Sequence, residues 1–159
     1  MNPSHTSSPR YPALAGFVLL TFCAAATGAL TGMPGPWYEA LQKPAWNPPS
    51  WVFGPAWTLL YIMMAVAAWL VWKRAGFGRP LWLYFSQLVL NAAWTPLFFG
   101  AHALGWAFAE LVVLWVAIAL TWQSFRKVNP IAGWLFVPYL AWVTFAASLN
   151  FEVWRLNPS

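Results

Sequence analysis

The sequence predicts an all-α membrane protein, a bundle of five transmembrane helices with a lid-like loop between the first helix and the second. Apolar residues make up 61% of the chain and charged residues only 7%, whereas a soluble domain has about 25% charged residues. The apolar residues also gather in five stretches of about 20 residues, the length that a helix needs to cross a bilayer. An ordinary soluble domain is therefore excluded, and residues 1–159 are expected to form one domain.

Each expected span is free of charged residues, apart from one that contains Glu110. The spans are 11–31, 51–72, 80–101, 103–125 and 128–151. They lack the alternating segments of about ten residues that form a membrane β-barrel, which favours helices. Short breakers rich in Gly, Pro or Asn separate the later spans, so neighbouring helices should run antiparallel.

The basic residues predict how the bundle is oriented. Six of the eight Lys and Arg residues fall on the side of the N-terminus, while Lys43 and Arg155 fall on the opposite side. Loops on the cytoplasmic side usually carry the excess of Lys and Arg. The N-terminus is therefore expected in the cytoplasm, provided that the protein resides in an inner membrane. The net charge of +5 is spread too thinly for a nucleic-acid site.

Aromatic and polar residues share a face on three of the expected spans. The sequence has 14 Trp residues, more than the aromatic belts at the membrane surfaces require. At helical spacing the deeper residues form three stripes: Trp57 and Tyr61; Gln87, Asn91, Trp94 and Phe98; and Pro138, Trp142, Phe145 and Leu149. Such faces favour an internal pocket for a flat, largely apolar ligand. For Gln87 or Asn91 alone, a hydrogen bond between helices is the alternative.

The segment 33–50 between the first two spans is predicted to be a lid. It holds five prolines, which stiffen it, and three large aromatic residues, Trp37, Tyr38 and Trp46. A simple linker would not carry so much apolar surface. The segment is therefore expected to pack onto the bundle rather than extend into solvent.

The residue types favour binding over catalysis. No nucleophile, base and orienting group form a recognisable set, and no cluster of Cys and His residues has the spacing of a metal site. We therefore expect neither a metal site nor an obligatory cofactor. An enzyme would have to use photochemistry, with Trp57 or Trp142 donating an electron to a light-absorbing porphyrin. A transporter is the third interpretation, which is disfavoured because five spans cannot form two equal inverted repeats.

Several linked motifs extend this picture over nearly the whole chain. They are Trp37-Tyr38 with Lys43-Pro44, Trp46-Asn47-Pro48-Pro49, Pro55-Ala56-Trp57-Thr58-Leu59-Leu60-Tyr61, Gln87-Leu88 with Asn91, Trp94-Thr95-Pro96-Leu97-Phe98-Phe99-Gly100, Val137-Pro138-Tyr139-Leu140-Ala141-Trp142, and Leu149-Asn150. In this order and spacing the motifs resemble the TspO/MBR family of tryptophan-rich sensory proteins. That family includes the mitochondrial translocator protein, also called the peripheral-type benzodiazepine receptor.

The resemblance implies five transmembrane helices around a pocket closed by the first loop, a homodimer, and a place in a bacterial cell envelope. The implied ligands are porphyrins and haem-related tetrapyrroles, sterols such as cholesterol, and benzodiazepine-site ligands, with a regulatory role in tetrapyrrole or stress responses. In some bacterial members it also implies light-dependent breakdown of bound porphyrin, and Trp57 and Trp142 match the residues concerned. Phe151 stands where the family's sterol-recognition segment has a Tyr, so a tetrapyrrole is favoured over a sterol.

The stripes, the lid and the resemblance together give a set of candidate ligand-binding residues. They are Tyr38, Trp46, Trp57, Tyr61, Gln87, Asn91, Trp94, Phe98, Pro138, Trp142, Phe145, Ala146 and Leu149. The expected partners are the lipid bilayer, a tetrapyrrole or sterol ligand and a second copy of the chain. Trp57 and Trp142 would also be catalytic residues if the photochemistry occurs.

Overall fold

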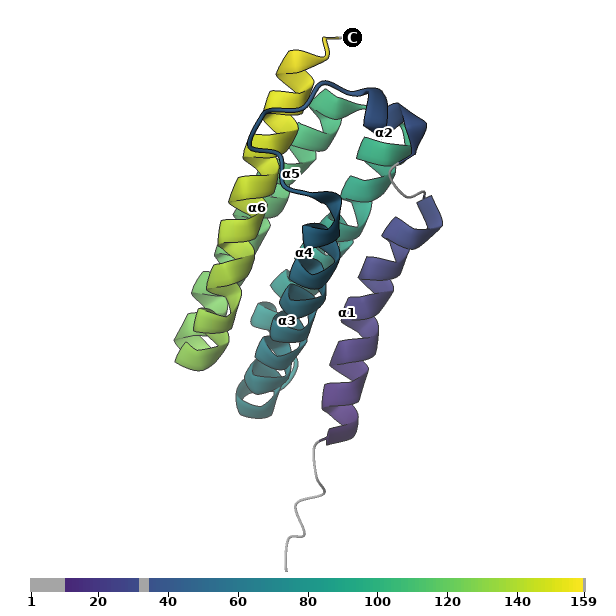
Figure 1. Cartoon of the computed structure of the whole chain (residues 1–159). Helices are drawn as coiled ribbons and strands as arrows, with labels where there is room; N and C mark the ends of the chain where they lie inside the picture. The colour runs from purple at the N-terminus through teal and green to yellow at the C-terminus, as the bar shows by residue number, and fades with distance from the viewer. Residues whose placement is uncertain (1–10, 32–34, 159) are drawn as a thin grey trace, which may run out of the picture.

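Five long helices run side by side as a bundle in the computed structural model (Figure 1). The structure describes residues 11–31 and 35–158. The helices are α1 (Tyr11–Thr31), α2 (Pro36–Ala40), α3 (Phe53–Ala75), α4 (Arg79–Thr95), α5 (Leu104–Val128) and α6 (Pro130–Leu156). A 3₁₀ turn, η1 (Ser50–Val52), precedes α3, and a π-helical turn, η2 (Pro96–Gly100), follows α4. Helices are the only regular structure in these two ranges, which confirms the all-α prediction.

Three of the long helices are apolar and long enough to cross a membrane by themselves. They comprise Ser50–Ala75, Leu104–Val128 and Pro130–Leu156. The apolar part of α1, Tyr11–Thr27, is shorter. The α-helical part of α4 has 17 residues, and η2 continues it for five more. The predicted membrane fold is therefore confirmed, with α1 and α4 completing the bundle.

Most predicted span boundaries need correction by a few residues, because charged residues end an apolar stretch without ending a helix. The span 51–72 is a helix from Phe53 to Ala75, and the span 103–125 is a helix from Leu104 to Val128. The span 128–151 begins later and ends at Leu156. Its start is fixed by Asn129, whose Oδ1 accepts a hydrogen bond from the Ile131 amide at 3.0 Å. This is an ordinary helix N-cap.

The span 80–101 also needs correction, because its last turn is not α-helical. The α-helix ends at Thr95, and the π-helical turn begins at Pro96. Proline has no N–H to donate to the preceding turn. The Ala101 amide donates to the Pro96 carbonyl, five residues earlier, at 2.8 Å. A bond over five residues is the hydrogen-bond pattern of a π-helix. Single π-helical turns are rare but frequently occur at functional sites, and here the turn carries Phe98 and Phe99.

The half of the bundle farther from the lid is filled by large aromatic side chains. Tyr84, Phe125 and Phe136 come from α4, α5 and α6 and are fully buried. The ring centres of Tyr84 and Phe125 lie 6.1 Å apart, and those of Phe125 and Phe136 lie 5.1 Å apart. The Tyr84 hydroxyl hydrogen bonds with the Thr21 hydroxyl, which ties α1 to this core. The packing makes this half a solid base for the bundle.

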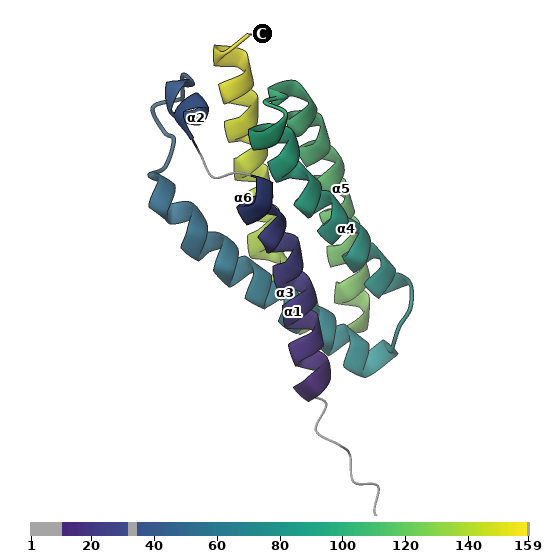
Figure 2. The same ribbon diagram turned by 90° about the vertical axis from the view of Figure 1, so that its right-hand side faces the viewer.

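The predicted lid contains a short helix that the sequence did not indicate. Helix α2 lies at the same end of the bundle as the C-terminus, and the chain then crosses that end before it enters α3 (Figures 1 and 2). Pro36 occupies the first turn of α2, where its fixed φ suits a helix and its missing N–H costs nothing. The residues Met33 and Pro34 of the predicted lid lie outside the described ranges.

Candidate ligand-binding site

A cavity of about 480 Å³ lies between the helices beneath the lid. It is lined by Phe22, Ala25, Tyr38, Phe53, Trp57, Thr58, Tyr61, Asn91, Trp94, Thr95, Phe98, Phe99, Leu111, Leu114, Trp142, Ala146, Leu149, Asn150 and Val153. Nine of these 19 residues are aromatic, and none of them carries a charge. The volume falls in the range of pockets that enclose drug-sized ligands, about 300–1,000 Å³.

Two tryptophans form a corner in the wall of the cavity. The Trp57 ring stacks on the Tyr61 ring, with centres 5.4 Å apart and planes at 26°. The Trp142 ring meets Trp57 edge to face, with centres 6.5 Å apart and planes at 87°. Phe53 adds a further edge contact to Trp142 at 5.9 Å. These rings hold each other in offset and T-shaped arrangements, so the corner is built before a ligand arrives.

A second aromatic group joins the wall to the lid. Trp94 stacks on Phe98 with ring centres 5.0 Å apart. Tyr38 of α2 packs against both Phe98 and Phe99, at 6.1 Å and 5.4 Å. Burial in this contact raises the pKa of the Tyr38 hydroxyl above its ordinary value, so the group stays a neutral hydrogen-bond donor at neutral pH. The lid thus contributes one ring and one hydroxyl to the cavity.

A chain of hydrogen bonds joins α3, α4 and α6 beside the cavity. The Tyr61 hydroxyl donates to the Asn91 Oδ1 at 2.8 Å, and the Asn91 amide donates to the Tyr139 hydroxyl at 3.0 Å. The Tyr139 hydroxyl in turn donates to the Gln87 Oε1 at 3.0 Å. All four side chains are buried. The interhelical hydrogen bonding expected as the alternative role of Gln87 and Asn91 is therefore present, and Asn91 still borders the cavity.

Asn150 serves a similar purpose nearer the lid. Its Oδ1 accepts a hydrogen bond from the Trp94 indole at 3.2 Å, and its amide donates to the Leu104 carbonyl at 2.9 Å. The side chain thereby fixes the Trp94 ring and donates a hydrogen bond to a backbone carbonyl at the start of α5. Trp94, like Asn91, faces the cavity with its polar atom already bonded.

Trp142 differs from Trp94 because its indole N–H has no acceptor within the described part of the chain, although the atom is buried. A buried donor left unpaired costs about 1–3 kcal/mol. The two carboxylate oxygens of Glu110 are likewise buried without a hydrogen-bond partner among the described residues. Of these two side chains, only Trp142 lines the cavity.

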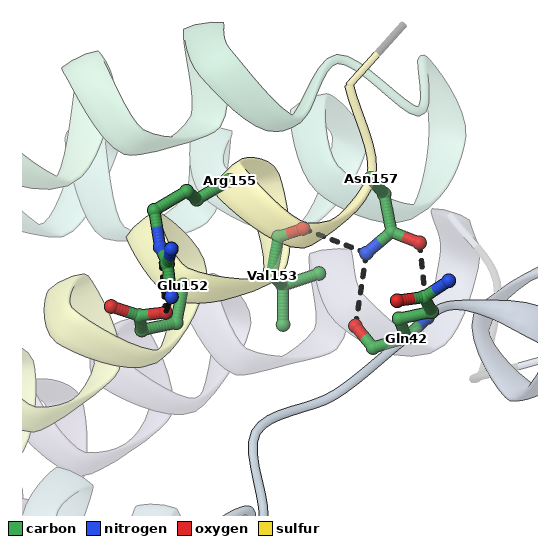
Figure 3. Close-up of polar contacts among 5 residues, drawn as sticks. All are labelled: Gln42, Glu152, Val153, Arg155 and Asn157. Carbon is green, nitrogen blue, oxygen red and sulfur yellow. Dashed lines mark hydrogen bonds and ion pairs between the residues drawn. The ribbon is translucent and has the colours of Figure 1, made fainter.

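Two further contacts attach the lid to the bundle. Trp37 of α2 stacks on His102, with ring centres 3.8 Å apart and planes at 12°. On the other side, Asn157 and Gln42 form a reciprocal pair (Figure 3). The Gln42 amide donates to the Asn157 Oδ1, and the Asn157 Nδ2 donates to the Gln42 carbonyl, both at 2.9 Å. These fastenings attach opposite ends of the α2 segment to the α4–α5 turn and to α6.

Most of the sequence-predicted site residues lie on the cavity wall. They are Tyr38, Trp57, Tyr61, Asn91, Trp94, Phe98, Trp142, Ala146 and Leu149. Four lie elsewhere: Gln87 is buried in the hydrogen-bonded chain, and Pro138 is exposed on α6. Trp46 packs on Phe145, with ring centres 5.8 Å apart, and Phe145 packs on Trp142 at 5.6 Å. Trp46 and Phe145 thus support the wall from behind.

Ten lining residues are not among the candidate ligand-binding residues named from the sequence. They are Phe22, Ala25, Phe53, Thr58, Thr95, Phe99, Leu111, Leu114, Asn150 and Val153. Continuing the α6 stripe beyond Leu149 would have found Asn150 and Val153, which follow Trp142 at i+8 and i+11. Phe22 and Ala25 carry no such signal, because α1 is apolar on all sides.

Comparison with known proteins agrees with this architecture. A model of the TspO/MBR family matches residues 17–155. The chain belongs to the TspO/MBR family. It is 48% identical over 145 residues to a tryptophan-rich sensory protein of Cereibacter sphaeroides, covering 88% of this chain and 91% of that protein. It is 45% identical to protein CrtK of Rhodobacter capsulatus, covering 86% and 87% of the two chains.

The likeness extends to animal members of the TspO/MBR family. The translocator protein of Homo sapiens is 48% identical over 126 residues, which cover 76% of this chain and 75% of that protein. The family and the membrane-length apolar helices together make this chain an integral membrane protein with several spans.

Proposed function

We propose that this protein is a membrane receptor that binds a tetrapyrrole, such as a porphyrin, in the cavity beneath the lid and thereby regulates tetrapyrrole or stress responses. It would act as a homodimer, as the family resemblance implies. The observation that carries the proposal is the composition of the cavity wall, where nine aromatic residues and no charged residue surround about 480 Å³. A flat, largely apolar macrocycle fits such a wall because its faces can stack on the indole and phenyl rings.

The polar groups of the wall suit the same class of ligand. The amide of Asn91 and the indole of Trp94 are engaged within the protein. The indole N–H of Trp142 has no partner in the described part of the chain, and a carbonyl or ring nitrogen of a ligand could accept from it. A sterol presents fewer acceptors and no flat π-face, so it gains less from this wall.

Filling the cavity tests the binding proposal. Ala25 of α1 lines the cavity, and the next residue, Ala26, is exposed on the outer side of the same helix. The A25F variant should weaken protoporphyrin binding about tenfold or more, because a large side chain competes for the same volume. The matched A26F variant should bind like the wild type. Quenching of tryptophan fluorescence by protoporphyrin in lipid nanodiscs measures both, and equal affinities for all three proteins would contradict the proposal.

Light-dependent breakdown of bound porphyrin is a second candidate activity. The T-shaped contact of Trp57 and Trp142 favours it, since two indoles 6.5 Å apart can share an oxidised state. In this reaction the excited porphyrin would take an electron from one indole and leave an indole radical cation. The porphyrin radical anion would pass that electron to molecular oxygen. The indole radical cation would regain an electron from the porphyrin ring as the reduced oxygen adds to it, so that molecular oxygen is the oxidant overall.

We also infer that the N-terminal end of the bundle faces the cytoplasm. Cysteines introduced at Phe77 and Lys127, after replacement of Cys23, should react with an impermeant maleimide only from the cytoplasmic side. A cysteine at Ser50 should react only from the opposite side. All three positions are exposed, and they lie at opposite ends of the bundle because α3 separates Ser50 from Phe77. Labelling of Phe77 and Ser50 positions from one side would contradict the inference.

A further inference from the structure

The end of the bundle opposite the lid carries five of the seven Lys and Arg residues of the described chain, and all five are exposed. They are Lys73 and Arg74 at the end of α3, Arg79 at the start of α4, and Arg126 and Lys127 at the end of α5. The carboxylates of the described residues lie elsewhere: Glu39 is in the lid, Glu110 is in the lid-side part of α5, and Glu152 pairs with Arg155 at 2.8 Å. This end is therefore a basic surface without acidic neighbours in the described ranges.

Backbone contacts bring three of these cations together. The Arg74 guanidinium donates to the Val128 carbonyl at 3.3 Å, which places it at the end of α5, next along the chain to Arg126 and Lys127. The turn after them is tight, because a Cβ added to Gly133 would lie 2.8 Å from the Arg126 Cβ. The ends of α3 and α5 are thus joined into one cluster of Arg74, Arg126 and Lys127, which we call the basic cluster.

The basic side chains at the ends of α3 and α5 are directed toward the level of lipid headgroups. Side chains on a helix slant toward its N-terminus, and at the C-terminal ends of α3 and α5 that direction leads back toward the apolar zone. The Arg126 guanidinium lies 4.7 Å from the centre of the Trp122 ring, one turn earlier. The Lys73 ammonium lies 4.2 Å from the Trp69 ring in the same way. A cation above an interfacial tryptophan is at the depth of lipid phosphates.

Exposed tryptophans flank this end on the neighbouring helices. Trp82 in the first turns of α4 and Trp134 in the first turns of α6 are 68% and 72% exposed. Such rings prefer the boundary between headgroups and acyl chains. These rings therefore place the boundary between headgroups and acyl chains slightly closer to the bilayer centre than the basic cluster. The phosphate of a lipid at this position would contact the cations, and its acyl chains would contact the tryptophan rings.

We propose that the basic cluster is a binding site for the headgroup of an anionic phospholipid in the adjacent leaflet. Two guanidinium groups and one ammonium offer paired N–H donors that match phosphate oxygens. A zwitterionic headgroup would bring its own cation and gain less. Basic groups between transmembrane helices are a known setting for anionic lipid headgroups in general. This site is separate from the cavity, and its occupancy does not depend on a ligand there.

The test compares two charge-matched double variants of the full chain. The R126Q/K127Q variant removes two cations of the basic cluster, and the K43Q/R155Q variant removes two cations at the lid end. Native mass spectrometry from nanodiscs with equal amounts of phosphatidylglycerol and phosphatidylcholine reports the ratio of the two lipids retained. Wild type should retain phosphatidylglycerol preferentially. At low salt each cation should contribute about fivefold to that preference, so R126Q/K127Q should lose about 25-fold and K43Q/R155Q less than about twofold.

Three results would overturn the proposal. They are an equal loss of preference in both variants, which would mean a net-charge effect, no preference in the wild type, and displacement of phosphatidylglycerol by excess inorganic phosphate, which would mean a site for free anions. Circular dichroism in the same nanodiscs checks that both variants keep wild-type helix content. If R126Q/K127Q has lost helix, it is replaced by R74Q, for which about a fivefold loss is expected.

Discussion

Replacing Trp142 by Phe is expected to slow the light-dependent loss of bound porphyrin about tenfold or more, which corresponds to at least about 1.4 kcal/mol in the barrier. Porphyrin affinity should fall by less, since Phe keeps most of the stacking area and an aromatic contact is worth about 1 kcal/mol. Phe is much harder to oxidise than Trp, so it cannot supply the electron. Absorbance under illumination measures the breakdown, and fluorescence quenching in the dark measures the binding.

Trp57 provides a second test of the same idea, and Trp115 provides the control. The W57F variant should behave like W142F, because the two rings touch edge to face. Trp115 lies on the outer side of α5, where its indole donates to the Thr144 hydroxyl at 2.9 Å. The W115F variant should change neither quantity. Parallel decline of affinity and breakdown in W57F and W142F would make both residues ordinary stacking groups and remove the photochemical candidate.

Replacing Asn157 by Ala should accelerate the release of a ligand from the cavity about tenfold or more. Asn157 makes two hydrogen bonds to the backbone of Gln42 in the lid, and each such bond contributes about 1 kcal/mol. Their loss removes one of the attachments between the lid and the bundle, so the lid should open more often. The effect should appear mainly in the dissociation rate, as it does for most changes in affinity. Stopped-flow recovery of fluorescence after displacement of the bound porphyrin measures that rate.

Arg155 supplies the matched control for this experiment. It lies two residues from Asn157, and its guanidinium pairs with Glu152 rather than with the lid. The R155A variant should release the ligand at the wild-type rate. If N157A and R155A behave alike, the lid does not govern release, and the ligand leaves by another route.

The bundle was largely predictable from the sequence, because the residues of a transmembrane helix must meet simple physical requirements. A helix in lipid must be apolar over about 20 residues, and charges such as those at Arg126 and Lys127 mark where this requirement ends. They do not mark where the helix ends, since α5 continues to Val128 and is stopped only by the capped start of α6. Helix α2 was not predictable, because five residues beginning at a proline carry no periodic pattern.

The cavity was predictable only in part, because a stripe fixes the face of a helix but not its rotation against its neighbours. Gln87 and Asn91 share one stripe of α4. The neighbours of Gln87 are Tyr139 and Met64 in the core, whereas Asn91 reaches the cavity as well. On α6, Trp142 lines the cavity, whereas Phe145 packs on the Trp142 ring without lining the cavity. Rotations of this size are set by packing between helices that are distant in sequence, which helical spacing does not report.

The division of the bundle into a solid half and a hollow half has a consequence for signalling. The core around Tyr84, Phe125 and Phe136 is filled, and the hydrogen-bonded chain from Tyr61 to Gln87 pins three helices beside the cavity floor. Insertion of a ligand can therefore displace the thin α2 segment far more easily than the helices below it. Under the proposed receptor function, a protein that distinguishes the ligand-bound form from the empty form should recognise the shape of the α2 face, on the membrane side away from the basic cluster.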